Sequence, residues 1–196
     1  MKRVILMLTL ICTAFCYTAL TESDELGIAA DEVVLMVDSG DLNLSGLYST
    51  EAFGLAEAVK LKPPSASWTL KRIQIAGWDF YIENETDPGE RIVCLEIRDK
   101  DLNVLYKYAD SQIAYFNAPW PGVLAEIEIP PLKVSDDFYV CFYDRGAVAV
   151  AYEFSESGEN SFVFNRFTGE MKPFRILVND TAEPAPVNWY IRAVGY

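Results

Sequence analysis

The sequence of 196 residues contains no histidine and has few positive charges. Without histidine, Ser-His-Asp and Cys-His catalysis, His-ligated zinc and histidine pH switches are all excluded. Only 16 Lys and Arg residues stand against 29 Asp and Glu residues, which gives a formal charge of −13. Because nucleic-acid binding depends on neutralising phosphates, we expect no nucleic-acid partner. No residue is assigned a catalytic role, and no organic cofactor is expected.

Long apolar runs are also missing, except at the N-terminus. A short basic segment, Met1 to Arg3, precedes residues 4–20, which carry no charge. This pattern is typical of a secretory signal peptide, so we predict cleavage of residues 1–21 and a single domain over residues 22–196. Two alternatives remain open. Residues 4–20 are close to the shortest membrane span, so an uncleaved segment is a membrane anchor, and Cys12 or Cys16 is a candidate lipoprotein cysteine. The predicted location is extracellular or the cell envelope, with membrane anchoring if the segment is retained.

Helical periodicity is scarce after the N-terminal segment, and alternation of apolar and polar residues predominates. Residues 91–98 place Val93, Leu95 and Ile97 on one face and the intervening side chains on the other. Further strands are predicted at residues 33–37, 55–61, 69–82, 104–108, 123–129, 138–143, 148–154, 161–164, 174–178 and 188–194. We expect Pro130 and Pro131 to end the strand at 123–129. Many short strands separated by turn residues predict an all-β fold, a two-sheet antiparallel β-sandwich of jelly-roll-like type.

Only two cysteines, Cys94 and Cys141, lie outside the N-terminal segment. They fall on the third and sixth of the eight best core strands counted from Leu55, which lie side by side in a jelly roll. An even pair in an exported chain predicts one disulfide, worth about 4 kcal/mol in the chain-entropy model. The alternative is two buried free thiols.

Six strand and turn segments carry a resemblance to a known family. They are residues 34–40 (VLMVDSG), 58–64 (AVKLKPP), 68–73 (WTLKRI), 96–106 (EIRDKDLNVLY), 137–140 (DFYV) and 189–194 (WYIRAV). The sequence resembles the jelly-roll-like β-sandwich accessory modules of archaeal and bacterial exported and cell-surface proteins, which are often appended to peptidases. The resemblance covers most of residues 31–195 and implies a binding or structural role for a module that here stands alone. It brings no catalytic residues.

Aromatic side chains gather at the far end of the predicted strand 69–82 and in a proline-braced loop over residues 115–122. The candidates for ligand binding are Trp78, Tyr81, Tyr115, Phe116 and Trp120. Exposed aromatic faces beside Asn and Asp hold sugar rings by apolar stacking and hydrogen bonds, and they also suit protein partners. An envelope glycan or a cell-surface protein is therefore the expected partner. The alternative is that these rings cap the ends of the core.

Oxygen-rich turns suggest two further kinds of site. Asp99, Asp101 and Asn103 have the spacing of a calcium loop, although the glycine and the twelfth-position glutamate of that motif are missing. A plain turn stabilised by Asp and Asn is the alternative. Glycosylation sequons begin at Asn43, Asn84 and Asn179, which are therefore candidate glycosylation sites.

The leading functional prediction is a non-catalytic, secreted or cell-envelope module that binds a glycan or protein or has a structural role. One alternative is a secreted carboxylate-dependent glycan hydrolase, for which Glu126 and Glu128 share a strand face about 7 Å apart. For that pair, an exposed strand face is the competing interpretation. The other alternative is a calcium-stabilised adhesion module.

Overall fold

The computed structural model describes residues 29, 31–41, 45–50, 52–80, 92–145, 147–156, 159–177 and 183–196. The chain divides into two compact units, Met1–Ala30 and Asp31–Tyr196, and the second contains all the elements described below. The predicted signal segment lies outside the described residues, as do Tyr81 and the three sequon asparagines. Within the described ranges, no helix has the length and apolar character needed to cross a membrane.

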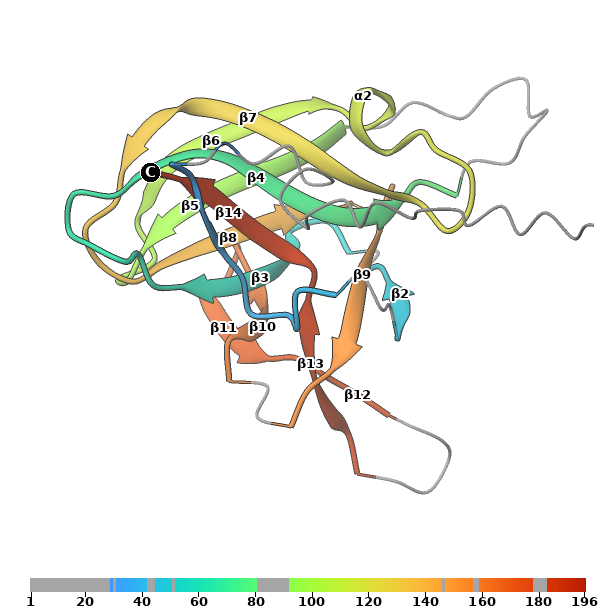
Figure 1. Ribbon diagram of the computed structural model, residues 1–196. Coiled ribbons are helices and arrows are strands. Elements are labelled where there is room, and N and C mark those ends of the chain that lie inside the picture. The colour runs from blue at the N-terminus through green and yellow to red at the C-terminus, as the bar shows by residue number, and fades with distance from the viewer. Residues whose placement is uncertain are drawn as a thin grey trace, which may run out of the picture. The chain divides into compact units, whose positions relative to one another are not determined.

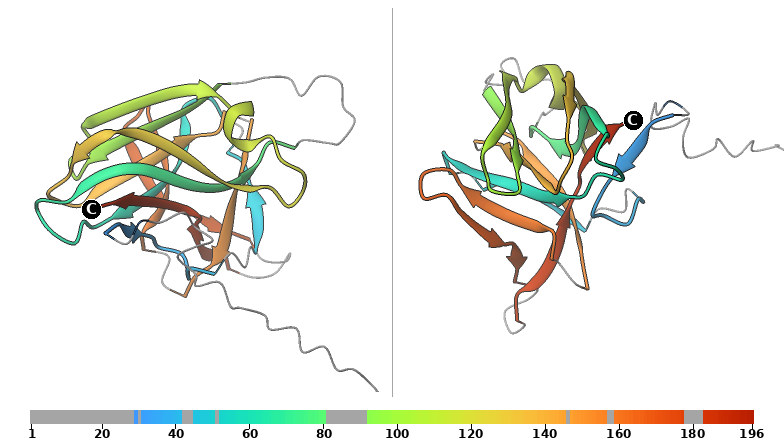
Figure 2. Two further views of the ribbon diagram at one scale, coloured as in Figure 1. Left: turned by 45° about the horizontal axis from the view of Figure 1, so that its top comes forward. Right: turned by 90° about the vertical axis from the view of Figure 1, so that its left-hand side faces the viewer.

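Two antiparallel sheets pack as a sandwich, which confirms the predicted all-β fold class (Figures 1 and 2). The first sheet has the order β1-β14-β4-β9-β13-β12, with β2 also paired to β9 and β7 to β4. Its strands are β1 (Val33–Leu35), β2 (Gly46–Tyr48), β4 (Thr69–Trp78), β7 (Val123–Lys133), β9 (Ala149–Phe154), β12 (Arg175–Ile176), β13 (Ala185–Trp189) and β14 (Ile191–Gly195). Figure 2 shows β1 beside the C-terminal strand β14, with which it pairs.

The second sheet has the order β11-β10-β3-β8-β5-β6. Its strands are β3 (Leu55–Leu61), β5 (Ile92–Asp99), β6 (Val104–Ser111), β8 (Phe138–Tyr143), β10 (Ser161–Asn165) and β11 (Glu170–Pro173). The only helix among the described residues is the single turn α2 (Ile113–Phe116). The alternation in the sequence sets which side chains face the core: Val93, Leu95 and Ile97 join the main core between the sheets. Cys94 belongs instead to a smaller cluster on the outer face.

The two cysteines lie on neighbouring strands but do not form the predicted disulfide. As expected, β5 pairs with β8, yet Cys94 stands opposite Tyr143 and Cys141 stands opposite Glu96. Such a diagonal separates Cα atoms by about 7–8 Å, beyond the range that a disulfide bridges without backbone movement. Both cysteines are buried and free, and burial raises the pKa of the Cys141 thiol to about 12. The alternative of two buried thiols therefore replaces the disulfide.

The strand that was expected to end before Pro130 continues instead to Lys133. β7 pairs with β4 alone among the described strands, so it is an edge strand, where a missing backbone N–H is tolerated. The pairing of β4 and β7 shifts register between Leu70 and Arg72, opposite the two prolines. This bulge absorbs the prolines without ending the strand.

Candidate functional site

Three aromatic side chains form an exposed patch at one end of the first sheet. Trp78 ends β4, Phe80 follows it, and Trp120 lies in the connection between α2 and β7. The Trp78 ring centroid lies 5.1 Å from that of Trp120, at 78°, and 5.0 Å from that of Phe80. Trp120 is 65% exposed and Phe80 is 49% exposed. We call Trp78, Phe80 and Trp120 the aromatic patch.

Backbone features in both segments hold the aromatic patch in place. Gly122 has φ +107°, a conformation that side chains rarely adopt, and a Cβ there would lie 2.4 Å from the backbone oxygen of Gly77. This close approach brings the connection before β7 against the end of β4, so that Trp120 meets Trp78. Phe80 also has a positive φ, of 62°, which is uncommon for a residue other than glycine. The patch is therefore built by two segments that are about 40 residues apart in the sequence.

The structure brings together two of the five predicted ligand-binding aromatics, Trp78 and Trp120. Phe116 is fully buried and packs on Phe142 at 5.6 Å, so its proposed binding role is wrong and the core-capping alternative applies. Tyr115 is half-buried. Its hydroxyl lies 2.6 Å from that of Tyr108 and donates to Asp110 Oδ2 at 3.0 Å. This hydrogen-bonded group occupies the polar end of the ring, so Tyr115 links α2 to β6.

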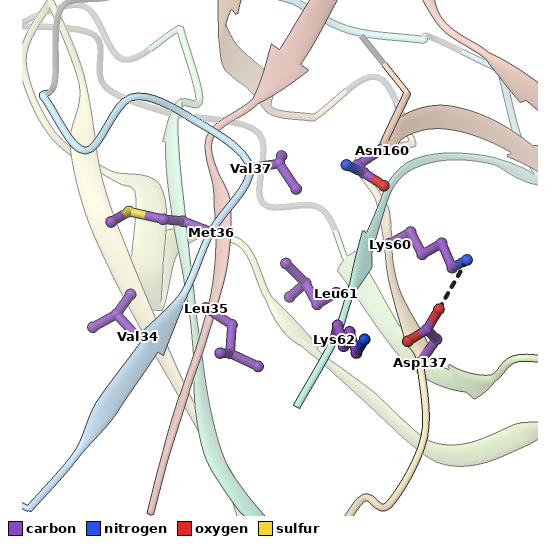
Figure 3. Close-up of a pocket in the computed structure, with 9 residues that line it drawn as sticks. All are labelled: Val34, Leu35, Met36, Val37, Lys60, Leu61, Lys62, Asp137 and Asn160. Carbon is purple, nitrogen blue, oxygen red and sulfur yellow. Dashed lines mark ion pairs between the residues drawn. The ribbon is translucent and has the colours of Figure 1, made fainter. Parts of the chain in front are cut away.

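A cleft lies elsewhere, between β1 and β3, and has a volume of about 570 Å³ (Figure 3). It is lined by Val34, Leu35, Met36, Val37, Lys60, Leu61, Lys62, Asp137 and Asn160. Asp137 supplies its one carboxylate, and Lys60 Nζ lies 3.0 Å from Asp137 Oδ2 (Figure 3). The hydrogen bond with Asp137 raises the pKa of Lys60. This cleft contains neither a carboxylate pair nor an aromatic ring among the residues that line it.

The calcium-like motif at Asp99 forms a hydrogen-bonded turn. Asp99 Oδ1 accepts hydrogen bonds from the backbone N–H groups of Asp101 and Asn103, at 2.9 and 2.8 Å. The Asn103 side-chain amide donates to Asp99 Oδ2 at 3.0 Å, and this bond, with the backbone bonds, lowers the pKa of Asp99. These hydrogen bonds are the ones expected for a plain turn stabilised by Asp and Asn. No group of three or more His, Cys, Asp or Glu side chains with metal-binding geometry occurs in the described part of the chain.

The carboxylates of β7 lie on the outer face of the first sheet. Glu126 and Glu128 are exposed and alternate with buried residues, as the competing interpretation of an exposed strand face expected. Glu126 Oε1 accepts a hydrogen bond from Gln74 Nε2 at 2.6 Å and lies 3.4 Å from Arg72 Nε.

Sequence reasoning missed a buried carboxyl pair, Glu57 and Asp144, both without solvent exposure. The Thr50 N–H donates to Glu57 Oε1 at 3.1 Å and to Asp144 Oδ2 at 3.0 Å. Ser49 Oγ also donates to Asp144. Burial and the negative charge of Asp144 raise the pKa of Glu57 well above its usual value. The signal was present, because Glu57 shares the inward parity of Val59 and Leu61 on β3.

Glu57→Gln is expected to flatten the dependence of folding stability on pH. The folded protein holds the pKa of Glu57 above its unfolded value, so the protonated carboxyl stabilises the fold below that unfolded pKa. This contribution is lost as pH rises through the folded pKa, with a slope of at most about 1.4 kcal/mol per pH unit. Urea unfolding of the wild type, measured at steps of roughly one pH unit between pH 4 and pH 9, should show this decline in the free energy of unfolding.

Glu128→Gln is the matched control, because Glu128 is exposed on β7. It should retain the wild-type decline, whereas Glu57→Gln should lose it and gain stability on the alkaline side. The same slope in both variants would show that Glu57 does not titrate in this way.

No protein-family model matches the chain, and no curated protein matches it at a significant level. Its class is therefore defined by the fold alone, an antiparallel β-sandwich of two sheets.

Proposed function

We propose that the protein is a non-catalytic binding module of the cell envelope or extracellular space that holds a glycan on the aromatic patch. The observation that carries the proposal is the exposure of Phe80 and Trp120 on either side of the half-buried Trp78, as one contiguous group at the end of β4. The location rests on the basic and apolar pattern of residues 1–20. The resemblance to accessory modules of exported proteins agrees with this role.

The geometry of the patch suits the apolar faces of sugar rings. Trp78 and Trp120 meet edge to face at 78°, so their rings present surfaces in two directions. Stacking of a sugar on such rings removes apolar area from water without needing a charged group. Because the Trp78 and Trp120 rings already contact each other, part of their side-chain conformational entropy is lost before a ligand binds.

A glycan hydrolase is the alternative, and the arrangement of carboxylates gives it less support. A general acid needs a raised pKa and contact with substrate. Glu57 has the raised pKa but is fully buried. A pocket of about 210 Å³ near Asp99 contains several carboxylates, but Asp136 pairs with Lys100 at 3.1 Å and the pKa of Asp99 is lowered.

Trp120→Ala is expected to abolish glycan binding, because it removes the most exposed ring of the patch. The measurement is calorimetric titration of the protein with neutral cello-, xylo- and chito-oligosaccharides, together with the shift in thermal midpoint. At a hundredfold excess over Kd, a bound ligand stabilises the native state by about 2.7 kcal/mol. Chromatography of the same mixtures shows whether the oligosaccharides are cleaved, which would support the hydrolase instead.

Phe154→Ala is the matched control for Trp120→Ala. Phe154 is also an exposed aromatic of the first sheet, but it lies at the opposite end of β9 from Ala149, the residue paired with Trp78. It should bind oligosaccharides as wild type does. If Trp120→Ala binds oligosaccharides as tightly as wild type, the aromatic patch is not the binding site.

A further inference from the structure

A second cavity lies on the outer face of the six-stranded sheet and gathers positive charge in this acidic chain. It has a volume of about 180 Å³ and is lined by Phe53, Gly54, Cys94, Lys107, Ala109, Tyr143, Arg145 and Arg166. Three of these eight side chains are cationic, while the chain as a whole carries −13. We call this cavity the basic pocket.

One carboxylate, Glu96, lies beside the basic pocket, and its oxygens are already engaged. Glu96 Oε2 accepts hydrogen bonds from Arg98 at 2.6 and 3.0 Å and from the Tyr143 hydroxyl at 2.7 Å. Burial alone would raise the pKa of Glu96, but these hydrogen bonds outweigh it and the pKa is lowered. Glu96 is therefore ionised, and its shortest ion pair is with Arg98, while Lys107 and Arg166 form longer ones with its other oxygen.

The remaining cations keep capacity for another anion. Lys107 Nζ and Arg166 approach Glu96 Oε1 only at 3.4 and 3.7 Å. Arg145 forms no ion pair with any residue in the described part of the chain, and its guanidinium lies 4.4 Å from the centroid of the Phe53 ring. Lys107, Arg145 and Arg166 thus place a local excess of positive charge around one cavity. An arginine guanidinium recognises carboxylate and sulfate groups through paired hydrogen bonds.

One exposed aromatic ring, Phe53, lines the same cavity, and a second, Phe167, packs on Phe53. Phe53 and Phe167 stack with centroids 6.4 Å apart at 23°, and they are 62% and 70% exposed. Gly54 makes this stack possible, since a Cβ there would lie 2.2 Å from the Phe167 ring. Its φ of +101° is also one that glycine adopts readily. The pocket therefore combines cations with a flat apolar border.

We propose that the basic pocket binds an acidic sugar, with the carboxylate or sulfate held by Arg145, Lys107 and Arg166 and the ring against Phe53 and Phe167. The cations alone would suit any small anion, and the stacked phenylalanines are what favours an anion carried on a ring. The basic pocket shares no residue with the aromatic patch. Its failure in a test would therefore leave the proposed function of the patch untouched.

The test is calorimetric titration of the full chain with trigalacturonate, a sulfated disaccharide, neutral trigalactose and a short polyglutamate peptide. We expect wild type to bind at least one of the two acidic sugars and to ignore neutral trigalactose. Arg145→Asn should weaken that binding by about tenfold or more, because a hydrogen-bonded ionic contact is lost. Asparagine tolerates the positive φ of 55° at this position, so the variant keeps its backbone. Lys107→Gln should weaken the same binding independently.

Lys133→Gln is the matched control, since it removes one exposed positive charge from β7 in the other sheet. It should bind the acidic sugar as wild type does. Three results would overturn the proposal: no binding of either acidic sugar, equal binding by Arg145→Asn, or tighter binding of polyglutamate than of both sugars. The last result would identify the pocket as a site for acidic peptides.

Discussion

Asp38→Ala should lower the free energy of unfolding by about 3–5 kcal/mol, because it leaves the charge of Arg192 buried without its partner. Arg192 Nη2 and Nε lie 2.6 and 3.0 Å from the two carboxylate oxygens of Asp38, and both side chains are almost fully buried. Arg192 also donates to the backbone oxygen of Gly40 at 3.0 Å. Urea denaturation followed by tryptophan fluorescence measures the loss.

Asp137→Ala provides a control at a more exposed ion pair. Lys60 and Asp137 are separated by 3.0 Å, but each side chain is about one third exposed. An exposed pair contributes at most about 1 kcal/mol, so this variant should remain close to wild type. The double variant Asp38→Leu with Arg192→Met should recover much of the stability lost in Asp38→Ala, because it removes both charges together. Equal losses in Asp38→Ala and Asp137→Ala would contradict the role given to burial.

Trp189→Ala should also cost about 3–5 kcal/mol, through a cavity in the main core. Trp189 has no solvent exposure and stacks on Phe174 with centroids 4.6 Å apart at 12°. Its indole N–H donates to the backbone oxygen of Phe162 at 3.0 Å, which joins the first sheet to the second. The variant loses the packing and leaves that carbonyl without its donor. Chemical denaturation is again the measurement.

Trp120→Ala serves as the control for Trp189→Ala, because the same side chain is removed from an exposed position. Its cost should be about 1 kcal/mol or less, chiefly from the lost contact with Trp78. A stable Trp120→Ala variant also validates its use in the glycan titration, since lost binding would then not reflect unfolding. A severe loss of stability in Trp120→Ala would assign the ring to the core.

The Asp38 and Trp189 predictions both concern the two C-terminal strands of the first sheet. β13 and β14 run consecutively, as the red ribbons of Figure 1 show, and carry Trp189 and Arg192. Arg192 holds the segment after β1, and β1 supplies one wall of the cleft between β1 and β3. The same C-terminal strands therefore stabilise the core and position a cleft far away in sequence.

Much of the fold follows from local alternation. The pattern of Val93, Leu95 and Ile97 was enough to assign their face, because neighbouring side chains of a strand point to opposite sides. The same parity placed Glu57 inward, although its partner Asp144 lies 87 positions later in the chain. The local prediction that Pro130 and Pro131 end the strand was wrong because strand pairing overrides it. The two prolines are compatible with β7 only because β7 is an edge strand.

By itself, the sequence determined the all-β class, the absence of histidine chemistry and the inner and outer faces of the main strands. These properties depend on composition and on a period of two residues, which are visible over short distances. Only the tertiary structure decided that Cys94 and Cys141 stay apart, that Trp78 meets Trp120 while Phe116 is buried, and that Lys107, Arg145 and Arg166 share a pocket. Each of these results depends on the register between distant strands, since a shift of two residues preserves the faces but changes which side chains meet.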